Sequence, residues 1–373
     1  MSQAFYPQGN DYWGLNIAGW NEYEFLARNP TGFFADIFRS NYDHGYAGFF
    51  SSIDSYWNDL KNTLVGKLLA VCNIFSRGNY YINSLFFNCF GFLGHVALFR
   101  VFNNLYTNKK WPVIIGTFLL PSALYFSSGI HKDLLVFTFV GLFCYALYFS
   151  MRCLRPLYIF TILVSFIALI LFRNFVAVAL VPATIAWIAC IKMRSRPIII
   201  FTTVYLAAWL LVWSVQLIKP SFQPLRVIAQ KQKDFFELPV ATSQLETHHL
   251  EPTMKSFIVN APQALNHSLL RPYLWEDKTV FLFPLALELF IYQLLFLLML
   301  FFYNRNMRNR DPFNLFCIFF ACSLLLFIGY IVPNTGSIVR YRSIYLPILF
   351  TPVLCLVDWQ KIWSLFQIRN KNI

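Results

Sequence analysis

The strongest constraint on this chain is a succession of long apolar runs that begins at Tyr80. Each run is about long enough to cross a bilayer core of roughly 30 Å as a helix. Charged residues make up only 13% of the sequence, whereas about 25% is usual in soluble domains. The pattern predicts an all-α membrane protein with about nine transmembrane helices, at residues 80–102, 111–127, 133–151, 157–172, 174–191, 197–218, 280–303, 312–332 and 343–359.

Basic residues in the connectors between these runs predict the orientation of the protein. Lys and Arg concentrate in short cytoplasmic loops, so the basic connectors and the C-terminus are expected in the cytoplasm. Residues 1–79 and the long loop 219–279 are then extracytoplasmic. The net charge of +13 is explained by this topology, and no nucleic-acid partner is expected. The basic residues in question follow the first, third, fifth and seventh runs or lie in the tail: Lys109, Lys110, Arg152, Arg155, Lys192, Arg194, Arg196, Arg305, Arg308, Arg310, Lys361, Arg369 and Lys371.

The polar N-terminal region is predicted to form a domain of its own. Residues 1–79 contain no run of spanning length, whereas residues 80–373 form the transmembrane bundle. Within the N-terminal region, Thr31 is expected to cap a short helix that starts near Phe33. The apolar stretch 64–75 is too short to span a bilayer, so it predicts an interfacial helix lying on the membrane.

The long outer loop is expected to contain short helices separated by prolines. Apolar residues at helical spacing within 254–270 predict an amphipathic helix across the bilayer surface. His248 and His249 are adjacent, so they point to different sides of a helix, and no third ligand follows at helical spacing. The eight cysteines form no CxxC pair and are interpreted as small core residues. No metal site or cofactor is therefore predicted. A divalent cation as cofactor is an alternative that no feature of the sequence supports.

The start of the chain does not resemble a signal peptide, because no basic segment followed by an apolar stretch is present there. Moving a long polar region across a membrane unaided is costly. We therefore expect an apolar helix upstream of Met1, absent through a misplaced start or a truncation. The alternative is a cytoplasmic N-terminal region with an inverted or re-entrant first span, which the basic connectors oppose.

Ionisable residues gather at the predicted outer boundary of the membrane. His131, Lys132 and Asp133 occupy the turn between two spans, and Arg173 interrupts a long apolar run. Positive charge at an outer boundary opposes the usual bias of topology, so it calls for another explanation. Charge-assisted hydrogen bonds to a lipid phosphate supply one, and snorkelling toward ordinary headgroups is the alternative. The same boundary is predicted to hold Arg271, Trp275, Glu276, Arg340 and Arg342.

Carboxylates and cations at an outer membrane face suit the transfer of a lipid-linked sugar. A carboxylate can take the proton from the attacking hydroxyl group as a general base. Cations can stabilise the negative charge that builds on a leaving phosphate. The chain carries no Gly-rich phosphate loop, GxSxG or HExxH motif, so the usual motifs of soluble enzymes do not explain it.

Four patches of the sequence resemble the C-type membrane glycosyltransferases, which use polyprenyl-phosphate-linked sugars. They are the segment from Pro121 to Asp133, Arg173-Asn174-Phe175, the segment from Leu270 to Glu276, and the segment from Gly336 to Arg342 with Tyr345-Leu346-Pro347. The resemblance implies sugar transfer from a polyprenyl-phosphate carrier to a glycan or lipid acceptor, during cell-envelope glycan assembly at the bacterial cytoplasmic membrane.

The resemblance also implies roles for single residues. The family carries an acidic residue just after a first transmembrane helix, and the nearest match is Asp11, which would be the general base. The chain departs from that pattern, because no helix precedes Asp11 and the acid is single. Lys132, Arg173, Arg340 and Arg342 would hold the carrier phosphate beside His131 and Asp133. Arg271, Trp275 and Glu276 would line the pocket for the sugar or the acceptor.

Two other functions fit the same features. A polymerase or ligase of lipid-linked oligosaccharide would share these traits of the fold. A non-enzymatic transporter or flippase would favour ionisable groups and Gly or Pro breaks near the middle of the membrane. Here the charges lie mainly at one rim, although prolines do fall inside predicted spans, among them Pro182, Pro284, Pro347 and Pro352.

Overall fold

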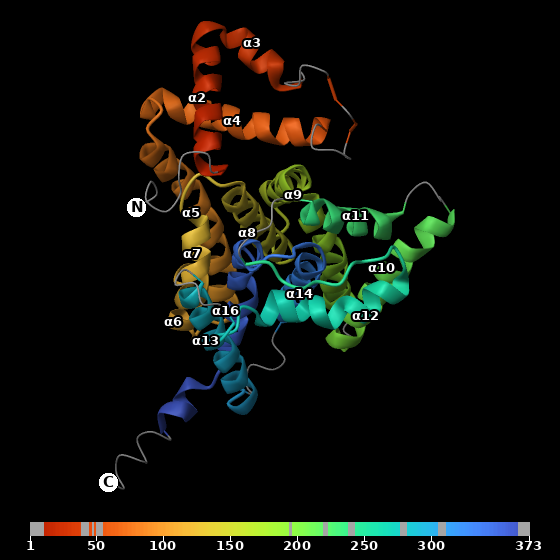
Figure 1. The fold of residues 1–373 in the computed structure, drawn as a ribbon. Coiled ribbons are helices and arrows are strands. Elements are labelled where there is room, and N and C mark those ends of the chain that lie inside the picture. The colour runs from red at the N-terminus through yellow and green to blue at the C-terminus, as the bar shows by residue number, and fades with distance from the viewer. Residues whose placement is uncertain are drawn as a thin grey trace. The chain divides into compact units, whose positions relative to one another are not determined.

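A computed structural model describes residues 11–38, 45–46, 48–49, 55–193, 196–218, 223–237, 243–276, 282–304 and 311–364. Within these ranges every regular element is a helix, and the only β pairings are isolated bridges (Figure 1). The chain divides into two compact units. Unit 1 comprises the described residues within Met1–Ala97 and Phe126–Asn174, and unit 2 those within Leu98–Tyr125 and Phe175–Ile373.

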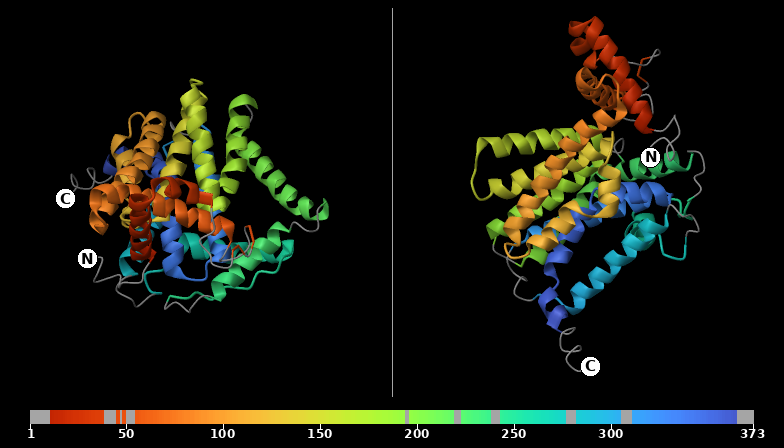
Figure 2. Two further views of the ribbon diagram at one scale, coloured as in Figure 1. Left: turned by 90° about the horizontal axis from the view of Figure 1, so that it is seen from above. Right: turned by 90° about the vertical axis from the view of Figure 1, so that its left-hand side faces the viewer.

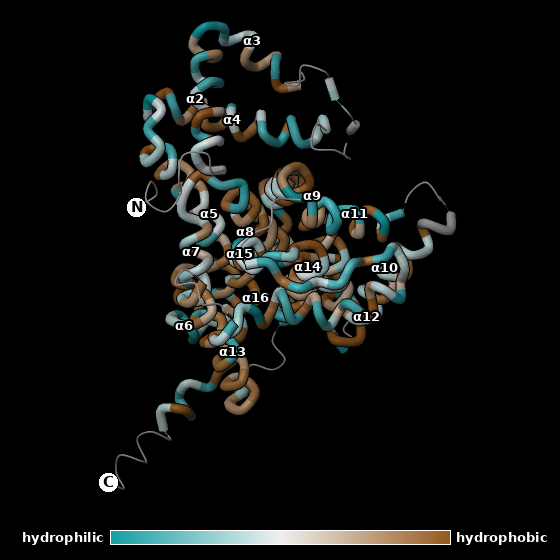
Figure 3. Tube along the Cα trace, in the orientation of Figure 1, coloured by the Kyte–Doolittle hydropathy of each residue, from teal (hydrophilic) through white to brown (hydrophobic). Residues whose placement is uncertain are grey.

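Six helices are long and apolar enough to cross a membrane, and the bent pair α15–α16 raises the number to seven if it counts as one broken span. Hydrophobic residues dominate along these helices (Figure 3). The prediction of an all-helical, multi-pass membrane protein is therefore confirmed. The six helices are α5 (Tyr80–Leu105), α8 (Lys132–Ser150), α9 (Pro156–Met193), α10 (Pro197–Ile218), α13 (Phe283–Phe301) and α14 (Phe313–Ile331).

The N-terminal part of unit 1 consists of α2 (Asp11–Arg28), α3 (Pro30–Ala35), the 3₁₀-helix η1 (Asp36–Phe38) and α4 (Tyr56–Ser76) (Figure 2). The cap of α3 is Asn29 and not Thr31, because the Asn29 side chain accepts a hydrogen bond from the Gly32 amide at 2.9 Å. Ser55 caps α4 in the same way. The apolar stretch 64–75 is thus only the last part of a longer helix.

Glycines allow α2 and α4 to pack closely. A Cβ atom on Gly19 would lie 2.4 Å from Cβ of Leu69, and one on Gly66 would lie 3.3 Å from Cγ of Glu22. Beyond α4, the chain turns at Arg77 and Gly78, both of which have positive φ. The buried amides of Asn16, Asn73 and Asn83 hold this turn: the Asn83 side chain donates to the side-chain oxygens of the other two, and Asn16 donates to the Gly78 carbonyl.

Glycines also bring α5 and α8 together inside unit 1. A Cβ atom on Gly94 would lie 2.7 Å from Cα of Thr138, and one on Gly141 would lie 2.6 Å from the Gly94 carbonyl oxygen. Small residues at such positions let membrane helices approach backbone to backbone. The core beside this contact includes Leu69, Ile130 and Leu134.

A break at Arg173 divides α9, as the charge within that apolar run predicted. Arg173 has φ −150° and ψ 85°, which are not helical, and α9 is 38 residues long. A straight helix of that length would extend about 57 Å, nearly twice the thickness of a bilayer core. The break lies between residues 157–172 and residues 174–191, which the sequence predicts as separate spans.

One predicted span is instead a pair of short helices, and another is preceded by a sharp bend. Residues 111–127 form α6 (Lys110–Phe118) and α7 (Pro121–Ser127), since Pro121 starts a new helix and cannot continue α6. The last predicted span is α16 (Leu346–Leu356), which follows α15 (Thr335–Ser343) at a bend of 66°. Hydropathy does not detect the break between α6 and α7, because Leu119 and Leu120, which separate the two helices, are apolar.

The long loop predicted at residues 219–279 contains α11 (Pro224–Phe236) and α12 (Met254–Leu265), and α12 continues into the π-helix η2 (Asn266–Leu270). The helix predicted within 254–270 is therefore confirmed. Gln232 on α11 is buried, and its side chain is hydrogen-bonded to the backbone around it. Its nitrogen donates to the carbonyls of His248 and Tyr330, and its oxygen accepts from the Leu250 amide. This amide ties α11 and the segment before α12 to the end of α14.

Candidate functional site

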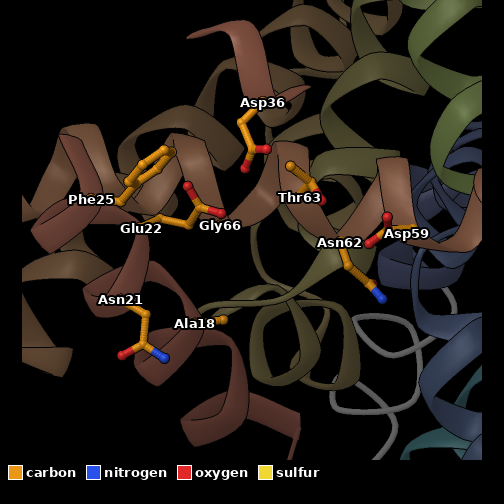
Figure 4. A pocket seen from close by; sticks show the side chains of 9 residues that line it. All are labelled: Ala18, Asn21, Glu22, Phe25, Asp36, Asp59, Asn62, Thr63 and Gly66. Carbon is orange, nitrogen blue, oxygen red and sulfur yellow. The ribbon is translucent and has the colours of Figure 1, made fainter. Parts of the chain in front are cut away.

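A cavity of about 540 Å³ opens in unit 1 between α2, η1 and α4 (Figure 4). Its wall combines three carboxylates with two amides, one hydroxyl and one aromatic ring. Such a set can accept hydrogen bonds from hydroxyl groups of a ligand and also present a flat apolar surface. The lining residues are Ala18, Asn21, Glu22, Phe25, Asp36, Asp59, Asn62, Thr63 and Gly66.

Glu22 is held in the cavity wall by a lysine. Its Oε2 lies 2.9 Å from Nζ of Lys67, whose side chain is buried. The same Nζ lies 4.2 Å from the centroid of the Phe33 ring, a distance that permits a cation–π contact. A lysine buried to this extent needs such partners, because burial of an uncompensated charge is expensive.

The other two carboxylates differ in their surroundings. Asp59 is buried in the first turn of α4, and its Oδ2 accepts a hydrogen bond from the Tyr46 hydroxyl at 3.4 Å. Asp36 begins η1 and is half-buried, and its side chain points toward Glu22 (Figure 4). Within the described ranges, no cation pairs with Asp36. Of the three, Asp36 is therefore the best placed to take a proton from a ligand.

Lys132 connects the predicted turn at 131–133 to this cavity. It is the first residue of α8, and its Nζ donates to Oδ1 of Asn62, which lines the cavity. The preceding turn depends on Gly129, which has φ 122° and whose amide donates to Oδ1 of Asn88 at 3.0 Å. A lysine reaches this cavity because the glycine turn and α5 position the start of α8.

His131, Asp133 and Arg173 form a cluster beside Lys132. The side chains of His131 and Asp133 are buried, and Asp133 Oδ1 accepts a hydrogen bond from the Arg173 guanidinium. The His131 ring nitrogen Nδ1 lies 4.0 Å from Asp133 Oδ2. Unit 1 thus brings together four of the ionisable residues that the sequence predicts at this boundary.

The other residues predicted to bind a substrate belong to unit 2. Arg271 Nε lies 3.0 Å from Oε1 of Glu276, whose Oε2 accepts a hydrogen bond from the Tyr273 amide. The Trp275 ring stacks on Tyr273 at 5.1 Å and is 79% exposed. The turn formed by residues 271–276 therefore presents a flat aromatic surface, which can pack against the apolar face of a sugar.

His267 lies under this turn and is held neutral. Its Nε2 lies 3.4 Å from NH1 of Arg271, and its side chain is buried. Burial, together with the charge of Arg271 and then His248, lowers the pKa of His267 to about 4. At neutral pH the imidazole therefore adds no positive charge to the turn.

Arg342 and Arg340 on α15 have different surroundings. Arg342 is buried, and its NH1 donates to the carbonyl oxygens of Ser268 and Arg271 at 2.9 and 2.7 Å. Arg340 is half-buried, and its guanidinium lies 6.0 Å from the centroid of the Tyr341 ring. In this arrangement Arg342 holds the backbone at the end of η2, and Arg340 is the more accessible of the two.

The cavity was not predicted from the sequence, because its carboxylates are far apart in the chain and lie on three helices. The glycines Gly19 and Gly66 are the residues from which the close contact of α2 with α4 could have been predicted.

Asp11, the predicted base, is the first residue of α2, about two turns before Ala18. The Asp11 side chain lies outside the described part of the chain.

The cavity does not provide a cluster of metal ligands. Among the described residues, no group of three or more His, Cys, Asp or Glu side chains could hold a metal ion. The cavity instead offers separate carboxylates, amides and two lysines bonded to its wall, a combination suited to polar organic ligands. No protein-family model, curated protein or solved structure matches this chain.

Proposed function

We propose that this protein is a membrane glycosyltransferase that takes a sugar from a polyprenyl-phosphate carrier and passes it to a glycan or lipid acceptor in cell-envelope glycan assembly. The observation that carries the proposal is the cavity of unit 1, whose wall contains three carboxylates and Asn62, the residue to which Lys132 donates a hydrogen bond from the start of α8. A carboxylate and a cation are the two groups that such a transfer requires.

The proposed reaction uses these groups as follows. The acceptor hydroxyl enters the cavity, and Asp36 takes its proton while the oxygen attacks the anomeric carbon of the sugar. The bond between that carbon and the phosphate oxygen breaks, and the carrier leaves with the electron pair. Lys132 stabilises the phosphate as its negative charge increases. The proton that Asp36 accepts is later released to water, which restores the carboxylate.

The cluster beside Lys132 has a supporting role in this proposal. The Arg173 guanidinium compensates the buried Asp133 carboxylate, and Asp133 lies in the first turn of the helix that Lys132 begins. A carboxylate there also interacts favourably with the N-terminal end of the helix dipole. In unit 2, we propose that Trp275 and Arg271 contact a sugar or an acceptor, and that Arg340 contacts a phosphate.

We further propose nine spans in the bacterial cytoplasmic membrane, with residues 1–79 outside and the C-terminus in the cytoplasm. Single cysteines in a cysteine-light background test this topology with an impermeant thiol reagent on intact cells. Positions 128, 243 and 334 should be labelled from outside, whereas positions 108, 195 and 306 should need permeabilised cells. Labelling of position 195 in intact cells would contradict the proposed orientation, because it would place that connector outside the cell.

Binding of undecaprenyl phosphate tests the role of Lys132. Loss of one charge-assisted contact costs about 1.5–3 kcal/mol, so Lys132→Ala should weaken binding about ten- to a hundredfold. Binding to purified protein in nanodiscs can be measured by native mass spectrometry, with undecaprenol as the lipid that lacks the phosphate. Lys110→Ala, at an exposed lysine on the predicted cytoplasmic side, is the matched control. Equal affinity of the wild type for both lipids would contradict a phosphate site.

One observation favours the transporter or flippase alternative. Glu288 lies inside α13 and is buried, and it accepts hydrogen bonds from the Ser122 amide and hydroxyl and from the Tyr292 hydroxyl. A buried carboxylate within a membrane helix is often functional. Here Glu288 accepts hydrogen bonds from the first turn of α7, and this structural role explains its burial even if the protein transports nothing.

A polymerase or ligase of lipid-linked oligosaccharide would need the same carboxylate and cation as the transferase.

A further inference from the structure

The outer face of α12 is apolar and exposed. Ile258 and Val259 are 59% and 65% exposed, and Lys255 and Pro262 lie on the same side of the helix. Residues three and four positions apart share a face, so these four side chains form one stripe along α12. Leu270, at the end of η2, is 42% exposed. Exposed apolar residues beside a lysine on one helix face are typical of a helix that lies at a membrane interface.

The opposite face of α12 is packed firmly on the end of α14 (Figure 1). The Tyr330 hydroxyl donates to the Phe257 carbonyl at 2.6 Å, and the rings of these two residues lie 5.2 Å apart. At Gly329 the contact is closer still, since a Cβ atom there would lie 1.9 Å from the Ala264 carbonyl oxygen. The direction of the exposed stripe is therefore set by backbone contact with α14.

The far end of α12 is fixed as well. Ser268 and Arg271 offer their carbonyls to Arg342, and the Leu270 carbonyl accepts from the Gln293 side chain on α13 at 3.1 Å. The helix is thus held at both ends against the helices of unit 2. It cannot turn its apolar stripe inward without breaking these bonds.

The length of α14 indicates the level of α12 relative to the bilayer. Its 19 residues extend about 28 Å, close to the roughly 30 Å of a bilayer core, so its end at Gly329–Ile331 lies near a boundary of that core. Because α12 contacts α14 at that end, the stripe lies at the level where headgroups meet acyl chains. Amphipathic helices bind at this level, with apolar residues buried and lysines at the headgroups.

We propose that the stripe formed by Lys255, Ile258, Val259 and Pro262 binds the bilayer itself, as an interfacial anchor of the outer loop. Ile258 and Val259 enter the boundary of the acyl chains, and Lys255 pairs with lipid phosphates. The anchor fixes the level of η2 and Arg271 at the membrane surface. This inference does not depend on the proposed transferase activity.

Fluorescence quenching in nanodiscs tests the anchor on the full-length protein. The environment-sensitive dye NBD is attached to single cysteines at position 258 or 259, and to one at the exposed residue Glu251 before α12 as the matched control. Phosphatidylcholine brominated near the start of its acyl chains should quench positions 258 and 259 several-fold more strongly than position 251. Aqueous iodide should show the reverse order.

Two results would overturn the proposal. Equal quenching by iodide at positions 251, 258 and 259 would place the stripe in water. Protection of positions 258 and 259 from both quenchers would show that a protein partner or a second copy covers it. The use of two adjacent positions guards against a variant that fails to fold, and a monodisperse elution profile is required of each.

Discussion

Replacing Asp36 with asparagine should lower the rate of sugar transfer by about 10²- to 10⁴-fold, the usual contribution of a general base. The carboxylate faces the cavity from η1, and no described cation pairs with it, whereas Glu22 is bound to Lys67. Asparagine keeps the shape of the side chain and removes its basicity. The measurement is transfer of radiolabelled sugar from polyprenyl-phosphate-linked donors in membranes that contain each variant.

Two further variants make this result specific. Glu24→Gln removes an exposed carboxylate of α2 that does not line the cavity, so it should leave the rate unchanged. Asp11→Asn tests the base that the family resemblance implies. If Asp11→Asn abolishes transfer and Asp36→Asn does not, the base lies at the start of α2 and the role of Asp36 is wrong.

Replacing Arg173 with alanine should destabilise the protein by about 3–5 kcal/mol, because the Asp133 carboxylate is left buried without its cation. Asp133 is 1% exposed, and the Arg173 guanidinium donates to its Oδ1. Thermal unfolding in detergent, followed by the loss of monodisperse protein, measures the change. The double variant Arg173→Met, Asp133→Asn should recover much of the loss, since it removes both charges.

A surface ion pair of unit 1 provides the control for Arg173. Arg28 and Glu24 lie one helical turn apart on α2 at 3.5 Å, and their side chains are 81% and 46% exposed. Exposed pairs contribute about 0–1 kcal/mol, so Arg28→Ala should hardly change the unfolding temperature. If Arg173→Ala and Arg28→Ala unfold at the same temperature, Asp133 does not depend on the guanidinium.

The sequence predicted the long helices because hydropathy is a local property. The break in α9 was also predictable, since Arg173 places a charge inside an apolar run. The division of 111–127 into α6 and α7 was missed, because the residues around the break are apolar and only Pro121 marks it. The cap of α3 was assigned to Thr31 although Asn29 holds it, since both residue types form caps.

The candidate site was predicted only in part, because cavities arise from tertiary contacts. His131, Lys132 and Asp133 stood out as charges between two apolar runs, and the structure places Lys132 at the cavity through Asn62. Asp36 and Asp59 gave no such signal, because polar residues are ordinary in a polar region. Asp36 lies on η1 and Asp59 on α4, so their proximity follows from the packing of η1 on α4, and no pattern within either segment encodes it.

Sugar transfer by the purified wild-type protein in proteoliposomes tests the proposed function most directly. The donors are polyprenyl-phosphate-linked radiolabelled sugars, and the acceptors are glycans and lipids extracted from the membranes in which the protein is made. We expect label to move to an acceptor only when the protein is present, and to stay on the carrier with Asp36→Asn. Absence of transfer from every donor, by protein that still binds undecaprenyl phosphate, would contradict a transferase and leave a flippase as the explanation.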